Sequence, residues 1–340
     1  MTGPDSPLRR RRLGLYAPFV LLLLLFAAVT MDWECTRAEI LQRLAAMRTG
    51  PAGRGVALAY GRARLYGFPF RLDLDLQNTR LSEPSGWAIS TPQMKAEAYL
   101  FSPAHWVVVA PVGLVIDRRQ NGPLIVRGKA LRASLAQIGA RPPRLSVEGL
   151  DLTFATPPGA RPFALASAGE FHLHTKGGPN DQGALYLSVV AGRASEASLL
   201  GRIAAGGPVD FTLEAIWSRA SKLAGSSWPG SLRNWAMSGG RLNLRRLEVT
   251  AGRAAVRVKP GLLTVGPDGR LSGQLSTTLV RASTLLNAMV LDGSLPAETA
   301  RAAALITGAP GSEAAVAPLD FQAGQTTLGP VALGPAPRLF

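Results

Sequence analysis

Residues 70–77, with the sequence FRLDLDLQ, alternate apolar and polar side chains without a break. Successive side chains of a β-strand point to opposite faces of a sheet, so this alternation predicts a strand with one dry and one wet face. The dry face would carry Phe70, Leu72, Leu74 and Leu76. The chain around this stretch is therefore expected to build sheets.

The same period of two recurs along the chain, at residues 145–154, 170–175, 184–190, 209–217, 241–250 and 271–280. Turn-forming residues separate these runs, as at Asn121-Gly122, 177–181 and 266–269. We count about fifteen strand candidates at the close spacing of antiparallel architectures. Four stretches have helical character instead, at residues 195–205, 231–237, 282–291 and 297–306. The sequence predicts a mainly β protein with a long antiparallel, curved sheet and a few short helices.

The dry faces of several strands would form one apolar surface. Besides the first strand, this surface would include Val209, Phe211, Leu213, Ala215, Leu271, Gly273 and Leu275. Such a surface can close against a second sheet as an ordinary core, or it can stay open and accept an acyl chain; composition favours the core. The candidate lipid contacts are Phe70, Leu72, Leu74, Leu76, Phe211, Leu213, Leu271 and Leu275.

A basic run precedes an apolar run near the start of the sequence. The basic run consists of Arg9, Arg10, Arg11 and Arg12. Residues 13–29 hold 17 positions without a charge, which as a helix extend about 26 Å towards the roughly 30 Å of a hydrocarbon core. Including residues 30 and 31 gives a membrane anchor at 13–31. Positive charge before it and Asp32 and Glu34 after it place the N-terminus inside and the rest of the chain outside the cytoplasm.

Two other interpretations of this segment compete with the anchor. A cleaved signal peptide has a shorter apolar region and a small-x-small cleavage site, and residues 27–31 fit such a site poorly. A lipoprotein anchored through Cys35 would need small apolar residues before the cysteine, where residues 31–34 are bulky or acidic. The sequence favours a retained anchor and leaves cleavage open.

A short helical stalk is expected between the anchor and the body. Thr36 and Glu39 have the spacing of a capping box, which predicts that a helix begins there. Ile40, Leu44 and Met47 then share one helical face, and Gly50-Pro51 ends the helix. The expected organisation is a cytoplasmic basic tail at 1–12, an anchor at 13–31, a stalk at 32–50 and one body at 51–340.

The net charge of the chain is strongly positive, with 37 Lys and Arg against 22 Asp and Glu, or +15. Such a balance often marks a nucleic-acid-binding protein. Here the arginines outside the N-terminal run are scattered singly, and a body outside the cytoplasm rarely meets nucleic acid. We expect no nucleic-acid partner; attraction to anionic lipid surfaces and a plain compositional preference for arginine both remain open.

Few residues are suited to catalysis or metal binding. The sequence contains no Gly-x-Ser-x-Gly elbow and no phosphate-binding Gly-x-x-x-x-Gly-Lys loop. His172 and His174 share one strand face and could hold zinc in a cryptic metallohydrolase, but a third ligand would have to be His105 or a distant carboxylate. Asp73 and Asp75 are more simply explained as the wet face of a strand. We expect no enzyme activity, no catalytic residue, no metal site and no cofactor.

Several motifs resemble a family of Gram-negative envelope proteins, domain-of-unknown-function family 2125. They are the segment 67–72 (GFPFRL), Trp87, and the pattern formed by Tyr99, Pro103 and His105. The resemblance covers nearly the whole chain, including the anchor.

Two further motifs resemble AsmA-like proteins. These are the closing pattern DFxxGxxxLGPVxLGxxPxL at 320–339 and the hairpin pattern DGxLxGxL at 268–275. The resemblance implies a single-pass protein of the bacterial inner membrane, with its N-terminus in the cytoplasm. Its periplasmic body would be a taco-shaped β groove associated with phospholipid movement and envelope integrity.

The size of the body limits what such a groove could do. Fifteen strands spaced at about 4.8 Å span only about 70 Å, which is too short for a bridge across the periplasm. The leading expectation is an anchored protein that binds or transfers lipid, with the membrane, phospholipid and envelope proteins as partners. The alternative is a structural or assembly scaffold with a closed β core, a protein partner and no lipid cargo.

Overall fold

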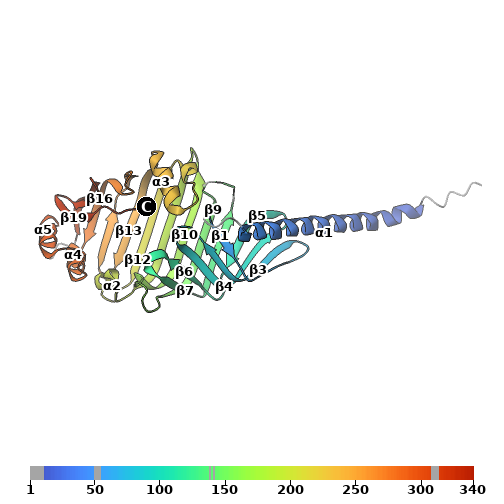
Figure 1. Cartoon of the computed structure of the whole chain (residues 1–340), viewed down its shortest axis with the longest axis horizontal. Coiled ribbons are helices and arrows are strands. Elements are labelled where there is room, and N and C mark those ends of the chain that lie inside the picture. Colours follow the sequence, from blue (N-terminus) through green and yellow to red (C-terminus); the bar gives the residue numbers. More distant parts are fainter. Residues whose placement is uncertain (1–10, 50–54, 138, 141, 308–313) are drawn as a thin grey trace, which may run out of the picture.

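A computed structural model describes residues 11–49, 55–137, 139–140, 142–307 and 314–340. Figure 1 shows a long helix that projects from one end of an elongated β body. The described strands form one sheet of 19 members, so the expected mainly β class with an N-terminal apolar helix is confirmed. The basic residues Arg9 and Arg10 lie outside the described residues, and Arg11 and Arg12 begin the helix.

The helices are few, as the sequence predicts. They are α1 (Arg11–Thr49), α2 (Leu199–Ala204), α3 (Trp228–Met237), α4 (Ala282–Leu291) and α5 (Ala297–Ile306), with 3-10 turns η1 (Arg119–Asn121) and η2 (Ala220–Lys222). The bounds of α4 and α5 agree with the predicted hairpin. Ser198 and Ser227 cap α2 and α3 through hydrogen bonds from their first turns, which sets where these two helices begin.

The strands follow the predicted pattern of alternation closely. Those of the first half are β1 (Ala57–Ala59), β2 (Arg62–Tyr66), β3 (Arg71–Ser82), β4 (Trp87–Tyr99), β5 (Ser102–Val109), β6 (Leu114–Arg118), β7 (Pro123–Arg127), β8 (Ala130–Ala136), β9 (Arg144–Ala155) and β10 (Leu165–Gly178). Those of the second half are β11 (Gln182–Ala194), β12 (Val209–Ser218), β13 (Arg241–Ala251), β14 (Ala254–Val258), β15 (Gly261–Val265), β16 (Leu271–Val280), β17 (Ala314–Gln322), β18 (Gln325–Leu328) and β19 (Val331–Pro335).

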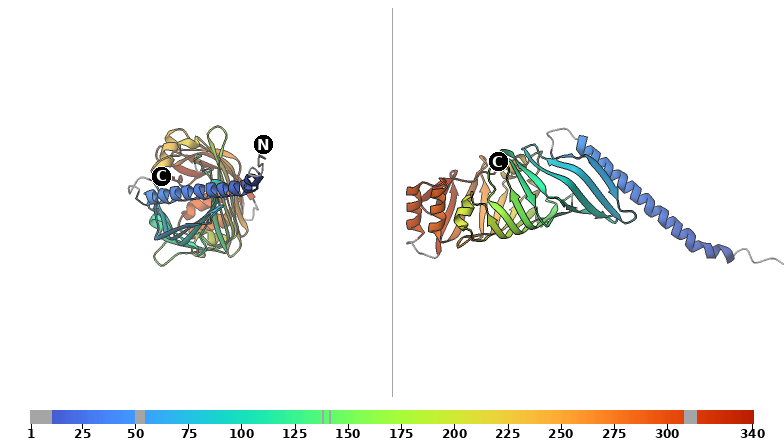
Figure 2. Two further views of the ribbon diagram at one scale, coloured as in Figure 1. Left: turned by 90° about the vertical axis from the view of Figure 1, so that its right-hand side faces the viewer. Right: turned by 90° about the horizontal axis from the view of Figure 1, so that it is seen from below.

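The sheet is a meander in which each strand pairs with its sequence neighbours or near neighbours, always antiparallel. Two short strands share one position at four places, with β1 and β2 beside β3, β5 and β6 beside β4, β7 and β8 beside β9, and β14 and β15 between β13 and β16. Counting each such couple once gives fifteen positions, whereas the predicted count of about fifteen strands is below the 19 that the structure has. Viewed along the long axis, the strands wrap around it (Figure 2, left).

The predicted start of a separate stalk helix at Thr36 is wrong, because α1 runs without interruption from Arg11 to Thr49. Thr36 lies inside this helix instead of capping a new one. No residue between the two segments breaks the helix, and Val29 and Ile40, from both segments, pack on one cluster of the body. Met47, expected on the packed face, is exposed. The predicted stop at Gly50-Pro51 lies outside the described residues.

Phe70, the first residue of the segment 70–77, also lies elsewhere than predicted. The backbone N–H of Arg71 donates to the carbonyl of Gly67 at 2.9 Å and closes a tight turn, so β3 begins only at Arg71. Phe70 therefore lies in the turn and is 55% exposed, whereas Leu72, Leu74 and Leu76 are buried. The strict alternation of the sequence starts one residue before the strand does.

The buried hydroxyl of Thr277 in β16 yields a stability prediction. Thr277 is 2% exposed, and its Oγ1 has no hydrogen-bond partner among the described residues. An unpaired buried polar group costs about 1–3 kcal/mol, so Thr277→Val should raise the free energy of unfolding by about 1 kcal/mol. Thermal unfolding of the full chain in detergent measures this, with Thr278→Val on the other face as control. A lower midpoint for Thr277→Val would contradict the prediction.

Candidate functional site

One row of side chains crosses the sheet on a single face, from the end near α1 to the opposite end. Directly paired residues of an antiparallel sheet point to the same side, so the strand register defines this row. We call it the apolar row: Leu74, Ala96, Val108, Ala133, Val147, Leu173, Leu187, Leu213, Leu247, Val258, Thr277 and Ala317. Thr277 is its one polar member.

Further apolar residues flank this row on the same side, which we call the apolar face. Its second row includes Phe171, Val189, Phe211, Val249, Val256 and Leu279. Of the predicted candidates, Leu72, Leu74, Leu76, Phe211, Leu213, Leu271 and Leu275 lie on this face by register, and Phe70 does not. Their contact with lipid stays a prediction.

Burial along the apolar row changes from its ends to its centre. Leu74 and Ala96 at one end are buried, as are Val258 and Ala317 at the other. The seven members from Val108 to Leu247, both included, are only half-buried. The row therefore combines two closed ends with a central part that keeps some apolar surface accessible.

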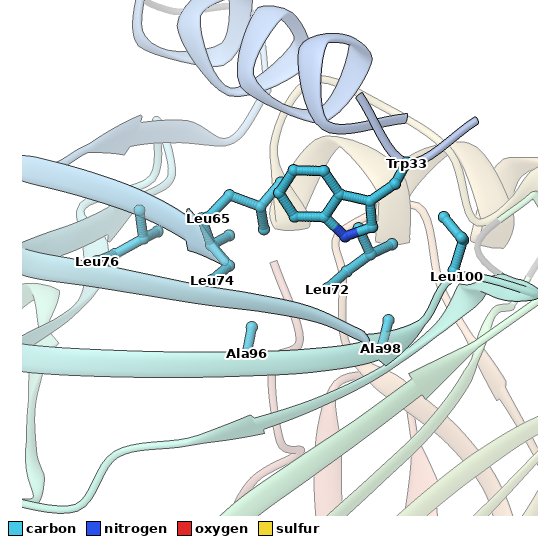
Figure 3. Close-up of a cluster of buried hydrophobic side chains, with 8 residues drawn as sticks. All are labelled: Trp33, Leu65, Leu72, Leu74, Leu76, Ala96, Ala98 and Leu100. Carbon is cyan, nitrogen blue, oxygen red and sulfur yellow. The ribbon is translucent and has the colours of Figure 1, made fainter. Parts of the chain in front are cut away.

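The C-terminal half of α1 covers the end at β3 and β4. Trp33 lies at the centre of this contact, above Leu72 and beside Leu65 and Leu100 (Figure 3). Its indole Nε1–H donates to the carbonyl of Arg71 at 3.0 Å, which fixes the helix on the turn before β3. The contact buries a cluster of Trp33, Leu65, Leu72, Leu74, Leu76, Ala96, Ala98 and Leu100.

The helical hairpin of α4 and α5 covers the opposite end. Leu286 and Leu295 join a cluster with Leu279 and Leu328 of the sheet. Helix α2 packs near Val209 and contacts β11 and β13. In the part of the chain that the structure describes, the clusters that α1, α4 and α5 form with the sheet include no side chain of β8, β9 or β10, the strands between these covers.

A loop covers part of the apolar face beside β7. Phe163, in the segment between β9 and β10, packs on Phe154 with ring centroids 5.1 Å apart. Both join the cluster around Leu124 and Leu152, to which Phe171 and Phe211 also belong. The apolar face is thus partly closed along this side.

A single indole brings a polar atom onto the apolar face between β11 and β13. Trp217 pairs with Gly183, and its ring fills the space where a side chain at 183 would stand. Its Nε1–H is buried and has no hydrogen-bond partner among the described residues. Periodicity alone does not reveal this buried, unpaired donor.

The opposite face of the sheet is polar and carries surface ion pairs. Glu248 accepts from Arg257 Nε at 2.7 Å and from Arg246 Nη2 at 2.9 Å. These two hydrogen bonds hold the pKa of the Glu248 carboxyl below its ordinary value. The separation of charged and apolar side chains onto two faces identifies the polar face as the solvated one.

The two histidines considered as zinc ligands lie on this polar face. His172 Nε2 lies 3.1 Å from Glu170, and the rings of His172 and His174 stack with centroids 6.0 Å apart. Asp73 pairs with Arg71 at 3.0 Å, as expected for a wet strand face. Within the described ranges, no group of three or more His, Cys, Asp or Glu could hold a metal ion.

A hollow on the polar face was not predicted from the sequence. It has a volume of about 390 Å³ and is open to solvent. Its polar lining includes Arg144, His174, Lys176, Tyr186, Glu214 and Arg245. These residues come from five different strands and carry no local spacing signal, so only the register brings them together.

The family model described as "Uncharacterized protein conserved in bacteria (DUF2125)" matches residues 33–337, so the chain belongs to this family. No curated protein and no solved structure matches the chain. The match begins at the helix residue that contacts the sheet, Trp33, and continues through the last strand. It thus covers the whole apolar face.

The contact of Trp33 with the sheet should dominate the attachment of α1. Trp33→Ala removes the central ring of the cluster and is expected to cost about 3–5 kcal/mol, the usual range for a buried aromatic side chain. Trp33→Phe keeps most of the packing but loses the donor to Arg71 and should cost about 1 kcal/mol. Chemical unfolding of the full chain in detergent measures both.

The matched control for these variants is Met47→Ala, since Met47 lies exposed on the same helix. It should leave the unfolding midpoint unchanged. Equal midpoints for Trp33→Ala and Met47→Ala would contradict the assigned contact.

The ion pairs of Glu248 predict a small pH effect. The folded pKa lies below the unfolded one, so Glu248 adds stability above its unfolded pKa and loses it as pH falls through the folded pKa. Because the group is near the surface, Glu248→Gln should lower stability by less than about 1 kcal/mol at neutral pH, and the difference should vanish in acid. Thermal midpoints from neutral to acidic pH test this, with Glu196→Gln as control. A stability difference between the two chains that grows in acid would contradict the prediction that ionised Glu248 stabilises the folded state.

Proposed function

We propose that the chain is a membrane-anchored protein that binds lipid acyl chains on the apolar face of its sheet. The observation that carries this proposal is the apolar row, which is apolar in every member but Thr277 and only half-buried at its centre. A fully buried row would serve only as a core. A half-buried one leaves apolar surface that gains free energy when another apolar group covers it.

The dimensions of the central row suit acyl chains. From Val108 in β5 to Leu247 in β13 it crosses seven strand positions. At about 4.8 Å between strands, this is about 29 Å, close to the roughly 30 Å thickness of two opposed acyl layers in a bilayer.

Helix α1 supports the membrane anchor. Residues Tyr16–Arg48 include a window apolar and long enough to cross a membrane, and only 6% of that window is buried against the body. A signal sequence near an N-terminus passes the same test, and the exposed apolar side chains gain most when a bilayer covers them. The arginines before the span and the acidic residues after it orient the N-terminus to the cytoplasm, which would place the body in the periplasm of a Gram-negative cell.

A scaffold role with a protein partner is the second candidate. The packing of Phe163 and its neighbours on the apolar face favours it, because that side of the face is already closed by the chain's own residues. Both candidates assign binding instead of catalysis, since the face on which they rest carries apolar side chains.

A substitution in the central row separates the two candidates. Native mass spectrometry of the full chain after mild detergent extraction should show bound phospholipid. Leu187→Gln places an amide in the middle of the row and should reduce the lipid-bound fraction at least several-fold. Leu187→Trp keeps the position apolar but fills it, and should reduce binding without adding polarity.

The matched control is Tyr186→Gln, the adjacent residue on the polar face, which should leave the lipid-bound fraction unchanged. Reproducible absence of lipid from the unaltered chain would overturn lipid binding. Equal lipid occupancy in all three variants would contradict the assignment of the lipid site to the apolar face.

A further inference from the structure

Two turns at the α1 end of the sheet expose an unusual number of aromatic side chains. The first turn joins β2 to β3 and the second joins β4 to β5. Outside α1, the described residues include eight exposed aromatic side chains, and five of them lie in or directly beside these turns. The five are Tyr66, Phe68, Phe70, Tyr99 and Phe101.

The two turns form one rigid unit. The backbone N–H of Leu100 donates to the carbonyl of Phe70 at 2.8 Å, and the rings of Phe70 and Phe101 lie 6.2 Å apart. Phe101 is 73% exposed although the neighbouring Leu100 is buried beneath it. The apolar rings are therefore held outwards by a fixed backbone.

This unit lies against the membrane-spanning part of α1. The ring of Phe68 packs edge-on against Phe26 at 5.9 Å and against Trp33 at 5.7 Å. Phe26 belongs to the apolar run and precedes the end of the anchor at Met31 by five residues, or about 7.5 Å along the helix. A bilayer that covers the apolar run of α1 therefore reaches the level of Phe68.

Charged residues begin directly beyond the aromatic turns. Arg71 pairs with Glu97 at 2.7 Å and with Asp73 at 3.0 Å, on the polar face of β3 and β4. Proteins at a membrane interface have the same arrangement, with aromatic rings at the level of the lipid headgroups and charged side chains further out in the water. The charged residues limit how deeply the turns can enter.

We propose that these two turns insert into the bilayer leaflet from which α1 emerges and form a second membrane contact of the body. The contact holds the sheet at a fixed height and angle on the membrane. It also places the covered end of the sheet, at β3 and β4, beside that leaflet. The inference rests on the proposed anchor and is independent of whether lipid stays bound.

Depth measurements on the full chain test this contact. In a Cys35→Ser background, single cysteines replace Leu23 in the anchor, Phe101 in the turn, or Met237 in α3 far from the turns, and each carries an environment-sensitive fluorophore. The proteins are reconstituted into vesicles of phosphatidylethanolamine and phosphatidylglycerol with brominated acyl chains. Bromine should quench the labels at positions 23 and 101 and leave the exposed position 237 unquenched.

Each result has a distinct meaning. Quenching at 23 without quenching at 101 overturns the inference and leaves the anchor intact. Quenching at neither position refutes the anchor itself, and with it the inference. Equal quenching at 237 and 101 also overturns it, because the whole body would then lie on the membrane.

A second label keeps the test independent of the residue replaced. Tyr99→Cys retains both phenylalanines of the turns and should be quenched as Phe101→Cys is. Adding Phe68→Ser and Phe101→Ser to Tyr99→Cys should reduce that quenching at least twofold while the label at position 23 is unaffected. Unchanged quenching at position 99 in that variant would show that the rings do not hold the turns in the leaflet.

Discussion

The register of the antiparallel sheet is the constraint on which the rest of the structure depends. Because side chains alternate between faces, a slip of one residue between any two strands would move all later apolar side chains to the polar face. The pairing keeps Leu173 opposite Leu187 and Leu213 opposite Leu247, so the apolar face continues unbroken. Where the register shifts, as between Glu214 and Ala215, the ladder skips Arg245 and leaves the apolar side chains on their face.

A sheet that grows by meander has two ends, and each needs a cover. At one end α1 seals β3 and β4 through Trp33, and at the other α4 and α5 cover β16 and β17 through Leu286 and Leu295. Exposed apolar edges would invite pairing with other chains, so these covers also protect the sheet. They leave the centre of the apolar face as the part on which the chain's own helices do not pack extensively.

The period-two pattern predicted strand positions well, because residues such as Leu213 and Leu275 must alternate to keep one face dry. It failed at boundaries set by contacts that a period of two does not encode. Phe70 follows the pattern but belongs to a turn closed by Gly67, and Thr36 has a capping spacing but lies within a helix whose two halves pack on one cluster. The apolar face was predictable as a surface; its half-buried centre and the Trp217 donor depend on pairings that are distant in sequence.

The two ends of the body differ in a way that gives the apolar face a direction. The end at β3 carries α1 and the exposed rings of Phe68 and Phe101, whereas the end at β17 is covered by a helical hairpin. Figure 1 and the right-hand view of Figure 2, which look across the long axis, show these ends opposite one another. Because helices cover the apolar face at both ends, its half-buried centre lies between the two covers, and the exposed rings mark the β3 end alone.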